Sequence, residues 1–218
     1  MIMFNCAECQ NQECQTRNKE SLNPACPMLD KEIFEEIKQA YHTEEIQSFY
    51  ANSLKSMRGS FGRWTRIKEI MEFCKYNGFT KIGLAYCSGM LREGRLANEI
   101  LRQNGFIVVA AGCKVGGFAP DELCESYEAP TAAQNPPNTP KQDIPRKNRA
   151  ICDPIGQAIM LNKEKTEFNI LVGSCVGHDS LFLKYSDAPC SVLVAKDRLL
   201  NNNPVTALYC HEEKNNNL

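Results

Sequence analysis

The sequence predicts an α/β protein, a three-layer sandwich with about four parallel strands. The chain has 218 residues, 43% of them hydrophobic, which is enough for one core and a small added module. Between residues 81 and 195, short apolar runs alternate with amphipathic segments of helical length. This alternation is typical of a parallel sheet that helices cover on both faces.

Two helical regions are expected before the sheet. Residues 30–57 carry apolar side chains at steps of three and four, which is the period of a helix with one buried face. A second helix is predicted over 63–76. Asn77-Gly78 follows it, and glycine at this position favours the left-handed conformation that ends a helix.

The alternating region supplies four strands and the helices between them. Apolar runs predict strands at 81–86, 106–111, 168–172 and 191–195, and the second run, FIVVAA, is apolar on both faces. Helices are predicted at 91–103, 154–165 and 178–185, with a last short element at 205–209. Asp153 is placed to cap the second of these helices, and Pro154 suits its first turn.

Residues 119–149 interrupt this pattern. The segment is polar and holds six of the eleven prolines, so it is predicted to be an inserted loop. It serves either as a lid or binding surface, or as an excursion without structure. The domain organisation that follows is a cysteine-rich segment at 1–29 and an α/β domain at 30–218 that contains the insertion.

Charge and cysteine content narrow the classes of function. The formal net charge is −1, so no basic field attracts nucleic acid or an anionic membrane. No stretch resembles a signal peptide or a membrane span, which favours a cytoplasmic location. Twelve cysteines in such a chain indicate metal or redox chemistry rather than disulfides.

Four cysteines in the first segment are spaced as ligands of a metal. Cys6, Cys9, Cys14 and Cys26 form the pattern C-x2-C-x4-C-x11-C, with few large apolar residues between them. Such a segment cannot fold by burying apolar surface, so a bound metal would hold it together. Zinc and an iron–sulfur cluster both remain possible, the latter because Pro27 follows the last cysteine.

A second set of cysteines is predicted to meet at one edge of the sheet. Cys87, Cys113 and Cys175 each follow a predicted strand, and Cys152 precedes a helix. The carboxyl ends of parallel strands share one edge, so the four thiols should lie together there. They would bind a second metal or iron–sulfur cluster, with His178 as a possible fifth or substitute ligand.

Another interpretation makes Cys175 a catalytic nucleophile. It lies in a strand-to-helix turn, where a thiolate is favoured, and His178 could take its proton while Asp179 orients that histidine. His178 and Asp179 are consecutive, however, and would point in different directions from one helix.

Other residues near the strand ends receive lesser roles. Three basic residues near the strand ends could balance the charge of a thiolate cluster or bind a small anionic ligand. They are Lys114, Lys196 and Arg198. Basic residues in turns are, however, more often simply exposed to solvent. Cys124 is an exchangeable ligand or a resolving thiol within the insertion. Cys74 is expected in the core, and Cys190 and Cys210 have no expected role.

Several motifs together resemble a known family. They are CAEC and CP in the first segment, CSG at Cys87, CKVGG at Cys113, CDPIGQAIMLN at Cys152, GSCVGHDSLF at Cys175 and APCSVLVAKDRLL after it. The chain is similar over almost its whole length to a bacterial and archaeal family of uncharacterised cysteine-rich proteins, described as predicted metal-binding. The resemblance implies metal binding by cysteines and implies no reaction.

Three hypotheses of function remain open from the sequence. The first is a zinc or iron–sulfur protein whose sheet edge holds a second thiolate site for redox chemistry or small-ligand binding. The second is an enzyme that uses Cys175, with a purely structural metal at the N-terminus. The third is a metal-stabilised interaction module in which the insertion contacts a partner. Whether the chain is an enzyme is thus left undecided.

Overall fold

The computed structural model describes residues 5–9, 13–16, 20, 22–126 and 149–214, the last four of these for their backbone alone. The chain divides into two compact units, Met1–Arg58 and Gly59–Leu218.

The first unit consists of short helical turns followed by helices. Its elements are the 3₁₀ turns η1 (Cys6–Glu8), η2 (Glu13–Gln15) and η3 (Pro27–Leu29) and the helices α1 (Lys31–Ala40) and α2 (Glu44–Ser60), the last of which runs into the second unit. The helical region predicted over 30–57 is therefore two helices. The chain breaks because Thr43 starts a new helix, where its Oγ1 accepts a hydrogen bond from the N–H of Ile46 at 3.4 Å.

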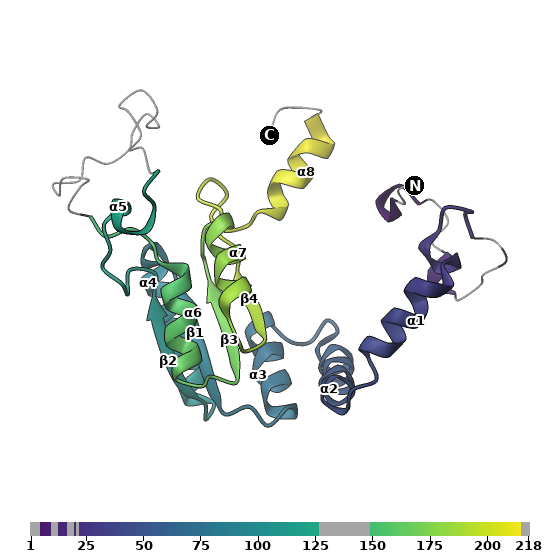
Figure 1. Cartoon of the computed structure of the whole chain (residues 1–218), viewed down its shortest axis with the longest axis horizontal. Coiled ribbons are helices and arrows are strands. Elements are labelled where there is room, and N and C mark those ends of the chain that lie inside the picture. Colours follow the sequence, from purple (N-terminus) through teal and green to yellow (C-terminus); the bar gives the residue numbers. More distant parts are fainter. Residues whose placement is uncertain (1–4, 10–12, 17–19, 21, 127–148, 215–218) are drawn as a thin grey trace. The chain divides into compact units, whose positions relative to one another are not determined.

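The second unit contains a four-stranded parallel sheet, as the sequence predicts (Figure 1). The strands are β1 (Lys81–Tyr86), β2 (Ile107–Gly112), β3 (Phe168–Val172) and β4 (Cys190–Val194), in the order β2-β1-β3-β4. In the register, Leu84 of β1 lies between Ala110 of β2 and Ile170 of β3. All four strands thus end at the same edge of the sheet.

The helices of this unit begin and end close to the predicted positions. They are α3 (Arg66–Tyr76), η4 (Ser88–Met90), α4 (Leu91–Gln103), α5 (Pro120–Leu123), α6 (Pro154–Lys163), α7 (Val176–Tyr185) and α8 (Val205–Lys214). Gly78 has φ +72°, so it ends α3 in the left-handed conformation. Asp153 caps α6 as predicted, because its Oδ1 accepts a hydrogen bond from the N–H of Gly156 at 2.7 Å. Helix α7 begins at Val176, two residues before the predicted start.

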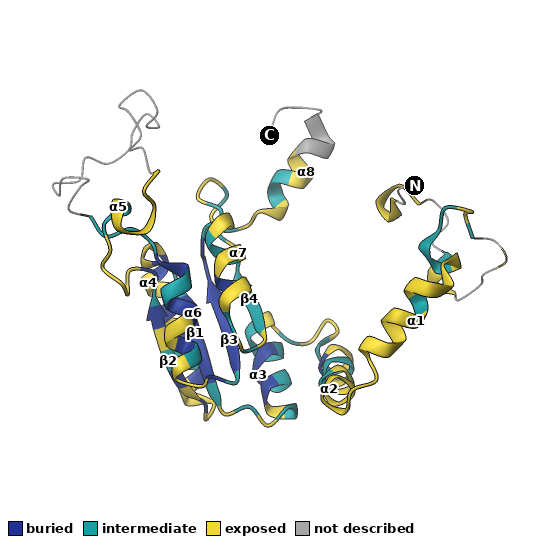
Figure 2. Ribbon diagram, in the orientation of Figure 1, coloured by how far each residue is buried: buried dark blue, intermediate teal, exposed yellow. Residues whose placement is uncertain are grey.

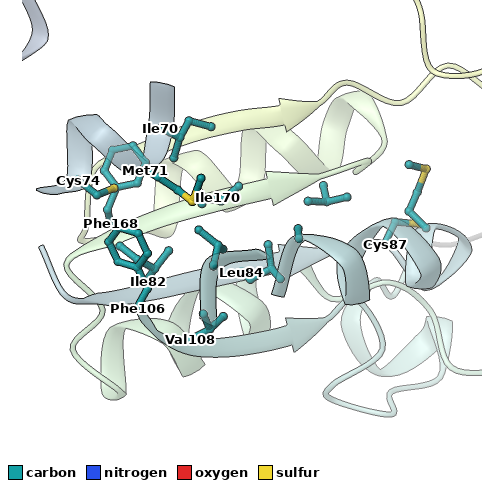
Figure 3. Close-up of a cluster of buried hydrophobic side chains, with 14 of the residues drawn as sticks. Ile70, Met71, Cys74, Ile82, Leu84, Cys87, Phe106, Val108, Phe168 and Ile170 are labelled. Atoms are coloured by element: carbon teal, nitrogen blue, oxygen red, sulfur yellow. The ribbon is translucent and has the colours of Figure 1, made fainter. Parts of the chain in front are cut away.

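Buried side chains form two clusters that follow the alternation of the strands. Figure 2 shows that most of β1 and β3 is buried. Successive residues of a strand point to opposite faces. Ile170 accordingly belongs to one cluster and Leu171 to the other. Helices α3 and α4 contribute to the first cluster, part of which is drawn in Figure 3, and helices α6 and α7 contribute to the second.

The second predicted strand differs from its expectation. Its apolar sequence suggests burial on both faces, but β2 is an edge strand, and Ile107 is 62% exposed. Sequence composition does not report strand order, which decides how many neighbours a strand has.

The predicted insertion at 119–149 is described only at its ends. Helix α5 opens it, Cys124 Sγ is exposed and lies 3.5 Å from Ser126 Oγ, and residues 127–148 are outside the described part of the chain. Within that described part, no helix is both long and apolar enough to cross a membrane.

The buried thiol of Cys74 is expected to make the stability of the protein depend on pH in the alkaline range. It lies in the core, as expected, and is 1% exposed. Burial, followed by the negative charge of Glu167, raises its pKa to about 12. In the unfolded chain this thiol loses its proton near its ordinary value of 9.0. The folded state therefore binds more protons above that pH, and its stability falls as the pH rises.

We expect the wild-type protein to lose about 1 kcal/mol more than Cys74→Ala between about pH 9 and about pH 10, measured by urea unfolding. Cys210→Ala is the matched control, because Cys210 is exposed, and it should follow the wild type. Equal losses in the wild type and in Cys74→Ala would contradict the assignment.

Candidate functional site

The ends of the strands carry the four predicted cysteines to one edge of the sheet. Backbone hydrogen bonds continue the ladder past the strands and fix this arrangement. The N–H of Cys87 donates to Val172 O at 3.1 Å, and the N–H of Cys113 donates to Tyr86 O at 3.0 Å. The N–H of Asp153, the residue after Cys152, donates to Cys113 O at 2.8 Å. Figure 3 shows Cys87 beyond the arrowheads of the strands, at the end of the cluster opposite Cys74.

Two of these cysteines are in direct contact. Cys152 Sγ lies 3.6 Å from Cys113 Sγ and donates a hydrogen bond to it. The N–H of Ser88 also donates to Cys113 Sγ, at 3.2 Å, and Ser88 Oγ lies 3.5 Å from the same sulfur. Two donors, the N–H of Ser88 and the thiol of Cys152, are therefore directed at Cys113 Sγ and favour a thiolate at this sulfur.

The two thiols of this pair have opposite pKa shifts. The hydrogen bond from Cys152 lowers the pKa of Cys113 well below its ordinary value, and Ser88 and the charge of Lys114 add to this effect. The hydrogen bond to Cys113 raises the pKa of Cys152, and burial raises it further. The hydrogen bond between the two sulfurs therefore favours the thiolate form of Cys113 and the thiol form of Cys152.

The other two thiols each contact a basic side chain. Lys196 Nζ donates to Cys87 Sγ at 2.6 Å, and Arg198 Nη2 donates to Cys175 Sγ at 3.1 Å. The pKa of Arg198 is raised, chiefly by its hydrogen bond to Cys175 and by the charge of that sulfur. The charges of Cys87 and Cys152 raise the pKa of Arg198 further, so the guanidinium interacts electrostatically with three of the four thiols.

A tight turn after β4 holds these two basic residues in place. Asp197 Oδ1 accepts hydrogen bonds from the N–H groups of Leu199 and Leu200, both at 2.9 Å. The N–H of Asn202 donates to Asp197 O at 2.8 Å. The sequence favours solvent-exposed side chains for Lys196 and Arg198. In the folded turn both side chains donate hydrogen bonds to cysteine sulfurs.

Ser88 and Gln157 are site residues that sequence reasoning missed. Gln157 is 1% exposed, and its Nε2 donates to Ala111 O at 2.7 Å and to Tyr86 O at 3.2 Å. It therefore links the ends of β1 and β2 immediately before the cysteines that follow them. The one available signal was a polar residue among the apolar positions of a helix. Nothing in the sequence marked Ser88.

His178 and Asp179 follow Cys175 in the first turn of helix α7. The backbones of His178 and Cys175 are hydrogen-bonded, because the N–H of His178 donates to Cys175 O at 2.8 Å. Burial raises the pKa of Asp179, and Ser174 opposes this by a hydrogen bond. Asp179 Oδ1 is buried and, in the part of the chain that the structure describes, has no hydrogen-bond partner.

The N-terminal cysteines lie in short turns. The N–H of Cys9 donates to Cys6 O at 3.3 Å, which closes the C-x-x-C turn. Cys6, Cys9 and Cys14 are exposed, and Cys26 is half-buried. Across all described residues, no group of three or more histidine, cysteine, aspartate or glutamate side chains is arranged to hold a metal ion. The structure thus brings together Cys113 and Cys152, and it pairs Cys87 and Cys175 with basic residues.

Together these features define an α/β protein whose parallel sheet carries a thiol-rich edge. Residues 26–193 match the family described as "Protein of unknown function (DUF1847)", and the chain belongs to that family. It is also 33% identical over 204 residues to the uncharacterized protein MJ0455 of Methanocaldococcus jannaschii, covering 94% of this chain and 93% of that protein. No solved structure matches the chain.

The matched region contains the whole sulfur set of the sheet edge. It begins at Cys26 and ends one residue before Val194, so it leaves out Cys6, Cys9 and Cys14 as well as the turn with Lys196 and Arg198. The predicted membership of an uncharacterised family is confirmed. The description of the family names no metal, so metal binding stays a proposal.

Proposed function

We propose that this protein binds a soft metal ion or an iron–sulfur cluster through cysteine thiolates, at the sheet edge and at the N-terminus. The observation that carries this proposal is the Cys113–Cys152 pair, with sulfurs 3.6 Å apart and donors directed at one of them. Thiolates are the preferred ligands of zinc and of iron–sulfur clusters.

The spacing of this pair fits two ligands of one metal ion. Four sulfurs at about 2.3 Å from a tetrahedral zinc ion lie about 3.8 Å from one another. Cys113 and Cys152 are close to this separation, and a backbone hydrogen bond between their segments holds them there. A pair that already matches the tetrahedral edge needs little rearrangement to bind.

Cys87 and Cys175, which follow β1 and β3 at the same edge, would complete the set if their side chains turn toward the pair. In this structure their sulfurs contact Lys196 and Arg198. Four thiolates around a divalent ion carry an excess of two negative charges, which nearby basic residues offset. The two basic residues would therefore remain useful once the sulfurs turn toward the ion, either to balance this charge or to bind a small anionic ligand.

The same proposal extends to the N-terminal segment, where Cys6, Cys9, Cys14 and Cys26 would hold a separate zinc ion or cluster. The closed turn between Cys6 and Cys9 supports this assignment, because such a turn allows two sulfurs to reach one ion.

The second unit is proposed to be a three-layer sandwich. Helices α3 and α4 pack against one face of the sheet, and helices α6 and α7 pack against the other face, which supports this proposal.

Metal analysis of the full chain after anaerobic purification tests the proposal. We expect two metal equivalents, or a brown protein with absorption near about 400 nm if a cluster is bound. The double variant Cys113→Ser/Cys152→Ser should lose the metal at the sheet edge, with the affinity for it reduced by more than about 100-fold. Mutation of residues that only hydrogen-bond to a metal ligand already lowers metal affinity by about 10–100-fold, and this variant removes two ligands. Cys6→Ser/Cys9→Ser should lose the other.

Cys210→Ser is the matched control for these variants, since Cys210 is exposed on α8. It should keep both metals. If Cys113→Ser/Cys152→Ser keeps the metal content of the wild type, the sheet edge is not a metal site.

A nucleophilic Cys175 is the second candidate, favoured by the Arg198 N–H directed at its sulfur. Here the N-terminal metal would be structural only. One metal per chain together with fast, stoichiometric alkylation of Cys175 would support this enzyme hypothesis over the first. One metal with slow alkylation would instead support a metal-stabilised interaction module.

A further inference from the structure

The Cys113–Cys152 pair has the geometry of a dithiol as well as that of two ligands. None of the twelve cysteines, all of which lie in described segments, is in a disulfide. The two sulfurs are 3.6 Å apart, and a disulfide bond is about 2.05 Å long, so rotation about the side-chain bonds can close the gap. The hydrogen bond from Asp153 N–H to Cys113 O at 2.8 Å keeps the two backbones at a fixed separation.

The two cysteines differ in their exposure to solvent. Cys113 is 4% exposed, and the N–H of Ser88 donates to its sulfur, whereas Cys152 is half-buried. Cys152 is thus the more exposed member of the pair. The rate of thiol–disulfide exchange depends on access to the attacking thiol, so we assign the first attack to Cys152.

Basic side chains lie near Cys152. Lys114 is exposed and interacts with Cys152, and its Nζ donates to Ala150 O at 2.6 Å. Arg198 is also exposed and lies within electrostatic range of Cys152. A small molecule that carries carboxylates would be attracted to this position.

We propose that Cys113 and Cys152 form a thiol–disulfide exchange site for low-molecular-weight anionic disulfides. This inference goes beyond metal binding. It uses two of the proposed ligands and therefore applies to the metal-free protein.

The exchange balances with the disulfide as the oxidant. Cys152 passes its proton to Cys113 Sγ, the acceptor of its hydrogen bond. Cys152 Sγ then attacks one sulfur of the substrate RSSR, which forms a Cys152–S–S–R bond and releases the first RS⁻. Cys113 Sγ then attacks Cys152 Sγ, which forms the Cys113–Cys152 bond and releases the second RS⁻. The proton shared by the pair ends on one of the two released thiolates, so the products are the Cys113–Cys152 disulfide, RSH and RS⁻. The two cysteine sulfurs lose two electrons, and the substrate disulfide gains them.

The test treats the full chain, reduced and stripped of metal by a chelator, with 3,3′-dithiodipropionate under anaerobic conditions. Mass spectrometry with peptide mapping should find a Cys113–Cys152 cross-link. Cys113→Ser should stop at a mixed disulfide on Cys152. Cys152→Ser should leave Cys113 unmodified over the same time, because the remaining thiol of the pair belongs to the buried residue. Cys210→Ser should behave as the wild type.

Charge recognition is tested by replacing the anionic disulfide with cystamine, which is cationic. We expect cross-linking to be at least about tenfold slower, because the basic residues would repel it. Equal rates would contradict an anionic substrate. Modification of other cysteines with no Cys113–Cys152 cross-link would overturn the site itself. Metal content measured before chelation reports separately on the proposed metal site, so the two proposals can fail independently.

Discussion

Gly173→Ala should lower the free energy of unfolding by about 3 kcal/mol and the melting temperature by about 10 °C. Gly173 ends β3 with φ +69°, a left-handed conformation that costs alanine about 1–2 kcal/mol. An added Cβ would also lie 2.5 Å from Met90 Cγ, which is buried. Because Cys175 follows two residues later, the displaced turn should also weaken metal binding at the sheet edge.

Gly78→Ala separates the two causes in this experiment. Gly78 has φ +72° and nothing within 4 Å of an added Cβ, so it carries the backbone penalty alone. It should cost about 1–2 kcal/mol and leave metal content unchanged. Thermal and urea unfolding measure both variants. An equal loss for both would mean that Met90 does not restrict the turn.

Gly83→Ala should be more damaging, at about 4 kcal/mol. An added Cβ would lie 1.9 Å from Asn169 Oδ1. Asn169 is completely buried, and it accepts a hydrogen bond from Thr166 Oγ1 at 2.8 Å and donates one to Ser186 Oγ at 2.8 Å. Displacing this amide both overpacks the core and leaves buried polar groups unpaired. Urea unfolding measures the loss.

Two further variants control this prediction. Gly177→Ala adds the same methyl group in helix α7, where nothing lies within 4 Å, and should be neutral or stabilising by up to about 1 kcal/mol. Asn169→Ala makes room beside Gly83. The loss of unfolding free energy in the double variant should therefore be smaller than the sum of the losses in the two single variants. Full additivity would argue against the contact.

Much of the fold could be predicted because each element depends on local chemistry. The apolar run of β3, the cap at Asp153 and the left-handed glycine after α3 each depend on a few residues that are adjacent in the sequence, and the structure has each of them. The break between α1 and α2 was missed, because the helical period continues across it and only Thr43 marks the new start. The exposed face of β2 was missed because strand order is not a local property.

The candidate site was predictable in its members and not in its contacts. Parallel strands end at one edge, so the positions of Cys87, Cys113 and Cys175 followed from the strand assignments. The partners of each sulfur did not follow. Lys196 lies 109 residues from Cys87 in the chain, and only the turn after β4 brings its Nζ to 2.6 Å from that sulfur.

The sequence by itself determined the α/β class, the strand and helix segments and the placement of cysteines just past the strand ends, since these depend on hydrophobic periodicity and turn residues. The tertiary structure decided which sulfurs touch each other and which touch a basic side chain. Such contacts depend on strand order and on side-chain directions, which are set by packing between segments far apart in the chain.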